Sequence, residues 1–168
     1  MQAGQAVRID ATGGEANAST GITVLDRLLE LAAHAGGFGL ALELAPDEPE
    51  AEVDEAGRVF GRALAPLLRA EGARGFGSGT MPADEALALV VLEASEQPLV
   101  ASNVDLSDAR IGGLGSDIAA RFFRELAETA GLVLHVRLIE GQDSQHVLEA
   151  IFKALGVAIA EACRGGER

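Results

Sequence analysis

The sequence predicts an α+β protein of one domain, built from two halves that resemble each other. Apolar residues make up 48% of the 168 residues, which is enough for a sizeable core. Helical and alternating apolar patterns follow one another along the chain. The order helix, glycine stop, strand, acidic loop, helix occurs twice. We therefore expect a single domain over residues 1–168, with halves at approximately 5–94 and 95–163.

The first half contains a helix that the apolar spacing marks clearly. Leu25, Leu28 and Leu29 share one face of that helix, Ser19 or Thr20 could cap its start, and the glycine pair 36–37 should end it. The expected elements are a strand at residues 7–9, this helix over 21–35, a strand over 38–44, an acidic loop over 46–52 and a helix over 54–70.

The second half shows the same kinds of pattern. Its expected elements are strands over 87–92 and 99–104, a glycine-rich turn over 112–115, a helix over 117–130 capped by Ser116, a strand over 132–139 and a helix over 143–163. Residues 25–36 of the first half align with residues 120–131 of the second, and both segments end in Ala-Gly. This agreement favours a duplication rather than a repeat array.

Charge and cysteine content exclude several classes of function. The chain carries 13 basic and 26 acidic residues, so its net charge of −13 argues against binding nucleic acid or an anionic membrane. Cys163 is the only cysteine, which excludes an internal disulfide and a CxxC metal site and fits the reducing cytoplasm. The first ten residues lack an apolar stretch, so we expect no signal peptide there. The mean hydropathy of +0.21 suggests that apolar surface is covered in a homo-oligomer.

The histidines supply the first candidate site. His146, Glu149 and Lys153 have the spacing of one stripe along a helix. An imidazole and a carboxylate one turn apart suit half of a divalent-metal site. The same spacing also gives a solvated ion pair between Glu149 and Lys153, which spacing alone favours. His135 shares one face of its strand with Arg137, away from the apolar face.

A glycine-rich turn over residues 111–117 supplies a second candidate. Backbone N–H groups there could cradle a phosphate at a helix start, as in small-molecule kinases of the galactokinase–homoserine kinase type. A single glycine-rich turn is a weak signal, and a turn with Ser116 as the helix cap is the favoured interpretation.

Several short motifs, spread over about residues 7–163, carry a family resemblance. They are Thr20-Gly21-Ile22-x-x-Leu25-Asp26, Gly36-Gly37-Phe38, Asp84-Glu85-Ala86, Phe122-Phe123-Arg124, Leu134-His135-x-Arg137-Leu138-x-Glu140-Gly141 and His146-x-x-Glu149-Ala150-x-Phe152-Lys153-Ala154. The last two are the most specific. Together these motifs resemble the imidazoleglycerol-phosphate dehydratase family.

That resemblance implies a fold and an activity. The fold is an internally duplicated α+β domain of the ribosomal-S5-domain-2-like kind, assembled from trimers into a 24-subunit shell. The activity is the dehydration of imidazole glycerol phosphate in cytoplasmic histidine biosynthesis. Mn(II) ions held between subunits grip the substrate imidazole as its anion and act as Lewis acids. Histidines and glutamates, many of them in two HHxxE helices, are the ligands.

The chain departs from the family at most of the ligand positions. The family motif LDHM becomes Leu25-Asp26-Arg27-Leu28, the first HHxxE becomes Glu50-Ala51-Glu52-Val53-Asp54, and the second becomes Gln145-His146-Val147-Leu148-Glu149. The resemblance leaves His135, His146 and Glu149 as candidate metal ligands, with Asp54 as a substitute. It makes Glu149 and Asp54 the candidate catalytic residues, and Arg74 and Lys153 the candidate phosphate ligands.

This ligand loss sets the functional expectation. Mn(II) prefers several oxygen and nitrogen donors and binds most weakly among the first-row divalent metals. We therefore expect one weak metal site or none, and a lyase that is weak or inactive toward the phosphorylated imidazole. The alternatives are a non-catalytic paralogue that acts as an oligomeric or ligand-binding protein, and a kinase-like phosphate binder that uses residues 112–116.

Overall fold

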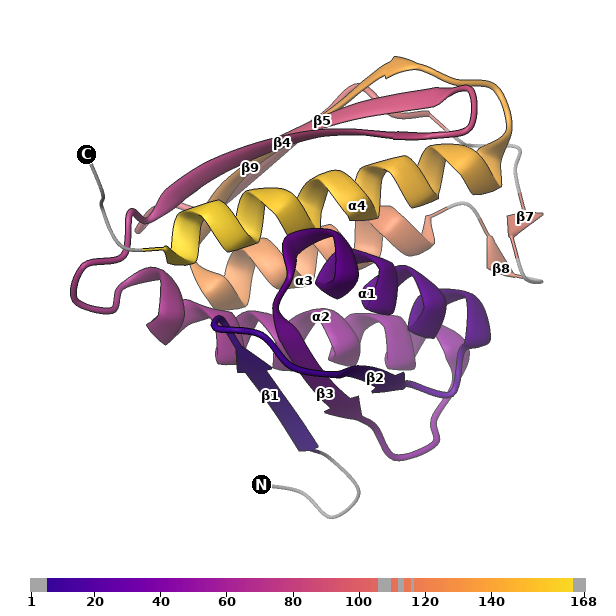
Figure 1. Ribbon diagram of the computed structural model, residues 1–168. Coiled ribbons are helices and arrows are strands. Elements are labelled where there is room, and N and C mark those ends of the chain that lie inside the picture. Colours follow the sequence, from indigo (N-terminus) through magenta and orange to yellow (C-terminus); the bar gives the residue numbers. More distant parts are fainter. Residues whose placement is uncertain (1–5, 106–109, 112–113, 116, 165–168) are drawn as a thin grey trace.

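The computed structural model describes residues 6–105, 110–111, 114–115 and 117–164, and these form four layers (Figure 1). A four-stranded sheet covers two helices, these pack on two further helices, and a three-stranded sheet covers the opposite side. The predicted α+β class is therefore confirmed, with the helices sandwiched between two small sheets.

The three-stranded sheet belongs to the first part of the chain. Its strands are β1 (Ala6–Asp10), β2 (Ala16–Ser19) and β3 (Gly39–Glu43), in the order β1–β3–β2. β1 pairs antiparallel with β3, whereas β2 pairs parallel with it. A parallel pair needs a crossover, which α1 (Thr23–Gly36) provides.

α1 ends where the sequence predicts and begins slightly later. Gly37 adopts the left-handed conformation at φ 73°, and its N–H donates to Ala33 O at 2.8 Å. The N-cap residue is Ile22, without a capping side chain, so the predicted cap at Ser19 or Thr20 is wrong. Thr20 instead donates its hydroxyl and its N–H to the Asp26 carboxylate, at 2.6 and 2.7 Å.

α2 (Pro49–Leu68) includes much of the acidic stretch that was expected to be a loop. Pro49 stands in the first turn, where its missing N–H costs no hydrogen bond. Glu50 and Glu52 follow in the same turn, and negative charge is stabilised at a helix N-terminus. The acidic stretch is therefore helical because its proline and glutamates suit a helix start.

The four-stranded sheet has the order β4–β5–β9–β6. Its strands are β4 (Phe76–Ala83), β5 (Ala86–Ala94), β6 (Leu99–Ser102) and β9 (Leu132–Glu140). β4, β5 and β9 are antiparallel neighbours, and β6 is parallel to β9. A short pair, β7 (Arg110–Ile111) and β8 (Leu114–Gly115), lies outside this sheet. β4 and β5 belong to the same sheet as β9. If the chain is divided according to which sheet each strand belongs to, the division falls between α2 and β4.

Glycine explains why the sequence analysis missed β4. Gly77 and Gly79 are buried in the strand, and a Cβ atom at either would clash with backbone carbonyls of α4 (Ser144–Cys163). Glycine normally weakens a strand, so its presence concealed this one. Here it allows the edge strand and the helix to pack backbone against backbone.

The central core lies between α4, α2 and α3 (Ile118–Ala130). The Phe122 and Phe152 rings pack with their centroids 5.6 Å apart. α1 crosses α4 at Gly156, where a Cβ atom would clash with the Ala32 carbonyl. Nearer the starts of the same two helices, Arg27 of α1 contacts Glu149 of α4.

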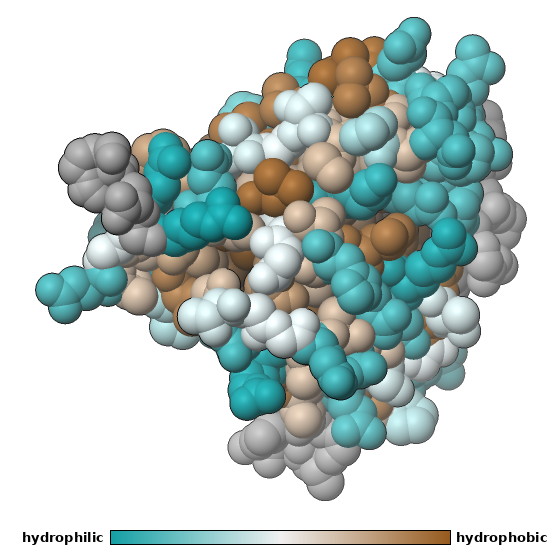
Figure 2. Space-filling model, in the orientation of Figure 1, coloured by the Kyte–Doolittle hydropathy of each residue, from teal (hydrophilic) through white to brown (hydrophobic). Residues whose placement is uncertain are grey.

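Only one face of the four-stranded sheet is covered by helices. The other face carries four exposed large apolar side chains, Phe76, Val91, Leu99 and Ile139. Figure 2 shows apolar patches among polar ones along this side of the molecule. Among the described residues, no helix is long and apolar enough to cross a membrane.

Candidate functional site

A pocket of about 550 Å³ opens where α1, α2 and α4 begin. Residues 21–24, at the start of α1, and Arg27 form one wall, Pro49 and Glu52 of α2 form a second, and Gln145 of α4 forms a third. Three helix N-termini, with their positive dipole ends, thus surround a space large enough for a small metabolite.

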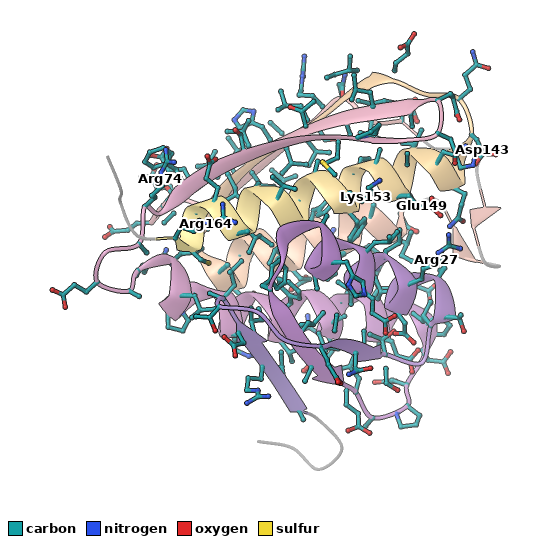
Figure 3. All side chains as sticks on the ribbon, in the orientation of Figure 1. Arg27, Arg74, Asp143, Glu149, Lys153 and Arg164 are labelled. Carbon is teal, nitrogen blue, oxygen red and sulfur yellow. The ribbon has the colours of Figure 1, made fainter. Side chains whose placement is uncertain are left out.

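An ion pair joins α1 to α4 beside this pocket. Nη2 of Arg27 lies 3.0 Å from Oε2 of Glu149, and Nε2 of Gln145 donates to the same oxygen at 3.0 Å. The Glu149 side chain is 12% exposed and that of Arg27 is 64% exposed. In Figure 3 the labelled Arg27 and Glu149 side chains lie close together at one end of the molecule. The Glu149 carboxylate is therefore nearly buried and neutralised by the chain's own guanidinium.

Glu52 is a second carboxylate at the pocket, and the sequence analysis gave it no role. Its residue is only 6% exposed, and its Oε2 accepts the Asp47 N–H at 3.0 Å. Its carboxylate packs against Gly21, whose φ of 94° and missing Cβ allow the close approach. The helical spacing of Glu52 with Val53 and Ala56, both buried, could have indicated that it faces inward.

His146 lies in the first turn of α4 between two carboxylates of the β4–β5 turn. Its Nδ1 is 2.7 Å from Oε1 of Glu85, and its Nε2 is 3.2 Å from Oδ2 of Asp84. The bond to Glu85 raises the pKa of His146. Hydrogen bonds from the Asp143 N–H and from His146 lower the pKa of Glu85 to about 2. Both ring nitrogens therefore face carboxylates and favour an imidazolium.

His135 lies elsewhere, on the outer face of the four-stranded sheet. It is an exposed residue of β9, and its neighbours on the adjacent strands are Val91 of β5 and Ala101 of β6. The rest of β9, up to Glu140, separates it from the start of α4 by roughly 16 Å of strand. One chain therefore does not bring His135 and His146 together.

Asp54 of α2 is bound by an arginine of α3. Nε and Nη2 of Arg121 donate to its two carboxylate oxygens, at 3.1 and 2.8 Å. The bond to Asp54 raises the pKa of Arg121. The side chains are 17% and 28% exposed, so the pair is largely shielded from water. Both oxygens of Asp54 already have a partner in the single chain.

The two candidate phosphate ligands lie apart from each other. Lys153 is one turn beyond Glu149 on α4 and donates to Pro82 O at 2.7 Å. Arg74 pairs with Glu161 at 3.3 Å and lies over the Phe76 ring, 4.4 Å from its centroid. Figure 3 shows Arg74 and Glu149 toward opposite ends of α4, and the helical rise puts Glu161 roughly 18 Å from Glu149. Within one chain, Arg74 is remote from the pocket.

These placements decide whether one chain suits the Mn(II) that the resemblance implies. Within residues 6–105 and 117–164, no three His, Cys, Asp or Glu side chains gather as a metal site would require. Arg27 forms an ion pair with Glu149, carboxylates flank His146, and His135 lies on the outer face of the four-stranded sheet. A cation beside a guanidinium would be repelled. In the part of one chain that the structure describes, these side chains therefore do not form a donor set that suits Mn(II).

The predicted phosphate cradle and helix cap depend on a glycine-rich turn. Gly112, Gly113 and Ser116 of that turn lie outside the described residues. α3 begins at Ile118 with Asp117 as its N-cap residue and without a capping side-chain bond.

The layered fold indicates the class of protein. An α+β structure of the same shape is known for imidazoleglycerol-phosphate dehydratase from Staphylococcus aureus, with a TM-score of 0.86, 29% identity, and coverage of 95% of this chain and 92% of that one. The enzyme from Pyrococcus furiosus also has a TM-score of 0.86, with 27% identity and coverage of 100% and 94%. The fold is therefore that of these dehydratases.

Sequence comparison identifies the family. The imidazoleglycerol-phosphate dehydratase family model matches residues 20–159. The chain is 34% identical over 166 residues to the dehydratase of Acetivibrio thermocellus, covering 96% of this chain and 85% of that protein. It is 35% identical over 167 residues to that of Desulfitobacterium hafniense, with the same coverage. The chain belongs to the imidazoleglycerol-phosphate dehydratase family, which confirms the resemblance found in its motifs.

Proposed function

We propose that the chain is a hydro-lyase that acts on imidazole glycerol phosphate with a turnover far below that of its relatives. The observation that carries this proposal is the Arg27–Glu149 ion pair, with Gln145 on the same oxygen. Arg27 and Gln145 stand where the family pattern has histidines, so the pair replaces ligands rather than adding to them.

The partners of the candidate residues explain the slow turnover. For Glu149 to accept a proton or bind a ligand, Arg27 must release it. For Asp54 to act, Arg121 must break two charge-assisted hydrogen bonds. Each rearrangement adds to the activation free energy, and every 1.4 kcal/mol or so lowers the rate about tenfold.

Phosphate binding is the part of the function that the pocket supports best. The Arg27 guanidinium keeps N–H donors free of Glu149 and lines the pocket with Gln145. Lys153 lies one turn further along α4. Arg74 can take part only if a second copy of the chain brings it to the pocket.

We further propose that the chain works as a homo-oligomer, between a trimer and a 24-subunit shell, in the cytoplasm. The exposed apolar face of the four-stranded sheet supports assembly, since exposed apolar patches mark interaction sites. His135 lies on that same face and could reach a neighbouring subunit's site. The single cysteine, Cys163, fits a reducing compartment.

Duplication of one ancestral unit is also part of the proposal. In the three-stranded sheet the central strand β3 has one antiparallel and one parallel neighbour, and β9 has the same two kinds of neighbour in the other sheet. A helix precedes and follows the central strand in both cases. This shared order supports two homologous halves.

A turnover assay tests the proposed activity. Purified protein with added Mn(II) is compared with the Acetivibrio thermocellus enzyme on imidazole glycerol phosphate. We expect a rate at least a hundredfold lower, which Glu149→Gln lowers further. A rate within about tenfold of the relative, a difference of ~1.4 kcal/mol in activation free energy, would refute the proposal. Substrate binding with no turnover, unchanged in Glu149→Gln, would favour the non-catalytic paralogue instead.

A further inference from the structure

Three side chains meet on one carboxylate oxygen where α1 passes the start of α4. Arg27 comes from α1, whereas Gln145 and Glu149 come from successive turns of α4. Both nitrogen donors lie 3.0 Å from Oε2 of Glu149. The oxygen therefore has two donors from two elements that are far apart in sequence.

Burial makes this arrangement more than a surface contact. The Glu149 side chain is 12% exposed, so without a counter-charge its carboxylate would carry a large desolvation cost. Among the cationic side chains of the described residues, only Arg27 forms an ion pair with it. Arg27 thus supplies the positive charge beside a carboxylate that is nearly buried.

The same three positions have the spacing of a metal centre. Residues 145 and 149 are separated by one helical turn, the spacing at which two side chains of one helix bind the same ion. Residue 27 approaches from a second helix and completes a three-sided arrangement. Metal-binding side chains at these positions would converge where the guanidinium now lies.

We propose that the Arg27 guanidinium is a built-in cation that takes the place of a divalent metal between α1 and α4. It neutralises Glu149, ties the two helices together and excludes a metal ion from that position. This inference rests on the proposed function only in taking positions 27 and 145 as former metal-ligand positions. Its physical basis is the pair of contacts that Arg27 and Gln145 make with Glu149. Under this proposal the junction is stable without metal, and Glu149 is not a metal ligand in the unmodified protein.

The test first introduces two histidines to rebuild a metal centre, and then removes the Glu149 carboxylate from that rebuilt centre. The variants are Arg27→His with Gln145→His, and the same pair with Glu149→Gln. Arg62→His is the matched control, because Arg62 is 55% exposed and also pairs with a glutamate, Glu55, at 3.5 Å. Co(II) alone is the probe, since imidazole ligands suit such metals and its visible absorption reports the ligand set.

Binding to the double variant should be at least tenfold tighter than to the unmodified protein, and Glu149→Gln should abolish the gain. Chelator should lower the Tm of the metal-loaded double variant but leave the Tm of the unmodified protein unchanged. Arg62→His should behave like the unmodified protein. A folded double variant that binds Co(II) no more tightly than the control would overturn the proposal.

A second measurement covers a double variant that fails to fold. Co(II) is titrated into the unmodified protein and into Glu149→Gln alone. Equal binding by the two supports the proposal, because Glu149 is then no ligand. A loss of binding of tenfold or more in Glu149→Gln overturns it. Fast dehydratase turnover with equal Co(II) binding would refute the proposed function and leave this inference standing.

Discussion

The ion pair between Asp54 and Arg121 should contribute measurably to the stability of the fold. It joins α2 to α3 through two hydrogen bonds of 3.1 and 2.8 Å, with side chains 17% and 28% exposed. Exposed pairs contribute about 0.2–1 kcal/mol, whereas breaking a buried pair costs about 3–5 kcal/mol. This pair lies between those limits, so Asp54→Ala should cost about 2 kcal/mol of unfolding free energy, with a coupling energy to Arg121 of about 1–2 kcal/mol.

A double-mutant cycle in urea measures that coupling. The four proteins are the unmodified chain, Asp54→Ala, Arg121→Ala and the double variant, all at one protein concentration because assembly shifts apparent stability. For a chain of this size, 2 kcal/mol corresponds to a Tm lower by roughly 4–8 °C. Arg62→Ala, in a more exposed and longer pair, should cost less than about 1 kcal/mol. A coupling energy below about 0.5 kcal/mol would contradict the two-bond contact between Asp54 and Arg121.

Three further predictions concern packing, pH and assembly. Gly156→Val should destabilise the fold by more than about 2 kcal/mol in urea, because its Cβ would clash with the Ala32 carbonyl, and a neutral effect would contradict the close crossing of α1 and α4. The stability that Glu85 contributes is present above its ordinary pKa of 4.5 and is lost as the pH falls toward about 2. Glu85→Gln should therefore cost more stability at pH 7 than at pH 3, and an equal loss at both would rule out the lowered pKa. Phe76→Ser with Ile139→Ser should shift the protein toward monomer in light scattering, since both side chains are exposed on the outer sheet face, and unchanged assembly would place the interface elsewhere.

Much of the fold could be predicted because apolar spacing reports burial directly. α1 buries Leu25, Leu28 and Leu29, and β9 buries the alternating Leu132, Leu134 and Val136, as their patterns indicate. These elements lie against the core on one face only, and such elements leave the clearest pattern in a sequence.

The missed elements have contrary local signals. β4 contains Gly77, Gly79 and Pro82, which usually mark loops, yet α4 packs so closely that only small residues fit. β2 (Ala16–Ser19) is short and only half-buried, so it shows no alternation strong enough to detect. In both cases the neighbouring element, rather than the local sequence, determines the strand.

The sequence draws attention to several residues near the pocket, although not to Glu52, and it does not reveal their contacts. Arg27 and Gln145 depart from the family motifs and Glu149 matches them, but their meeting depends on how α1 crosses α4. The pairing of Asp54 with Arg121 likewise depends on the packing of two helices from different parts of the chain. Such tertiary contacts have no signature in a single sequence.

Counting the Mn(II) ions bound by the unmodified, assembled protein tests most directly whether this chain has replaced the metal centre of its family. Equilibrium dialysis against micromolar Mn(II), followed by elemental analysis, gives the number of ions per chain. Arg27 forms an ion pair with Glu149, and Gln145 stands where the family pattern has a metal-binding histidine. We therefore predict fewer than one tightly bound ion per chain. Two tightly bound ions per chain would contradict that replacement.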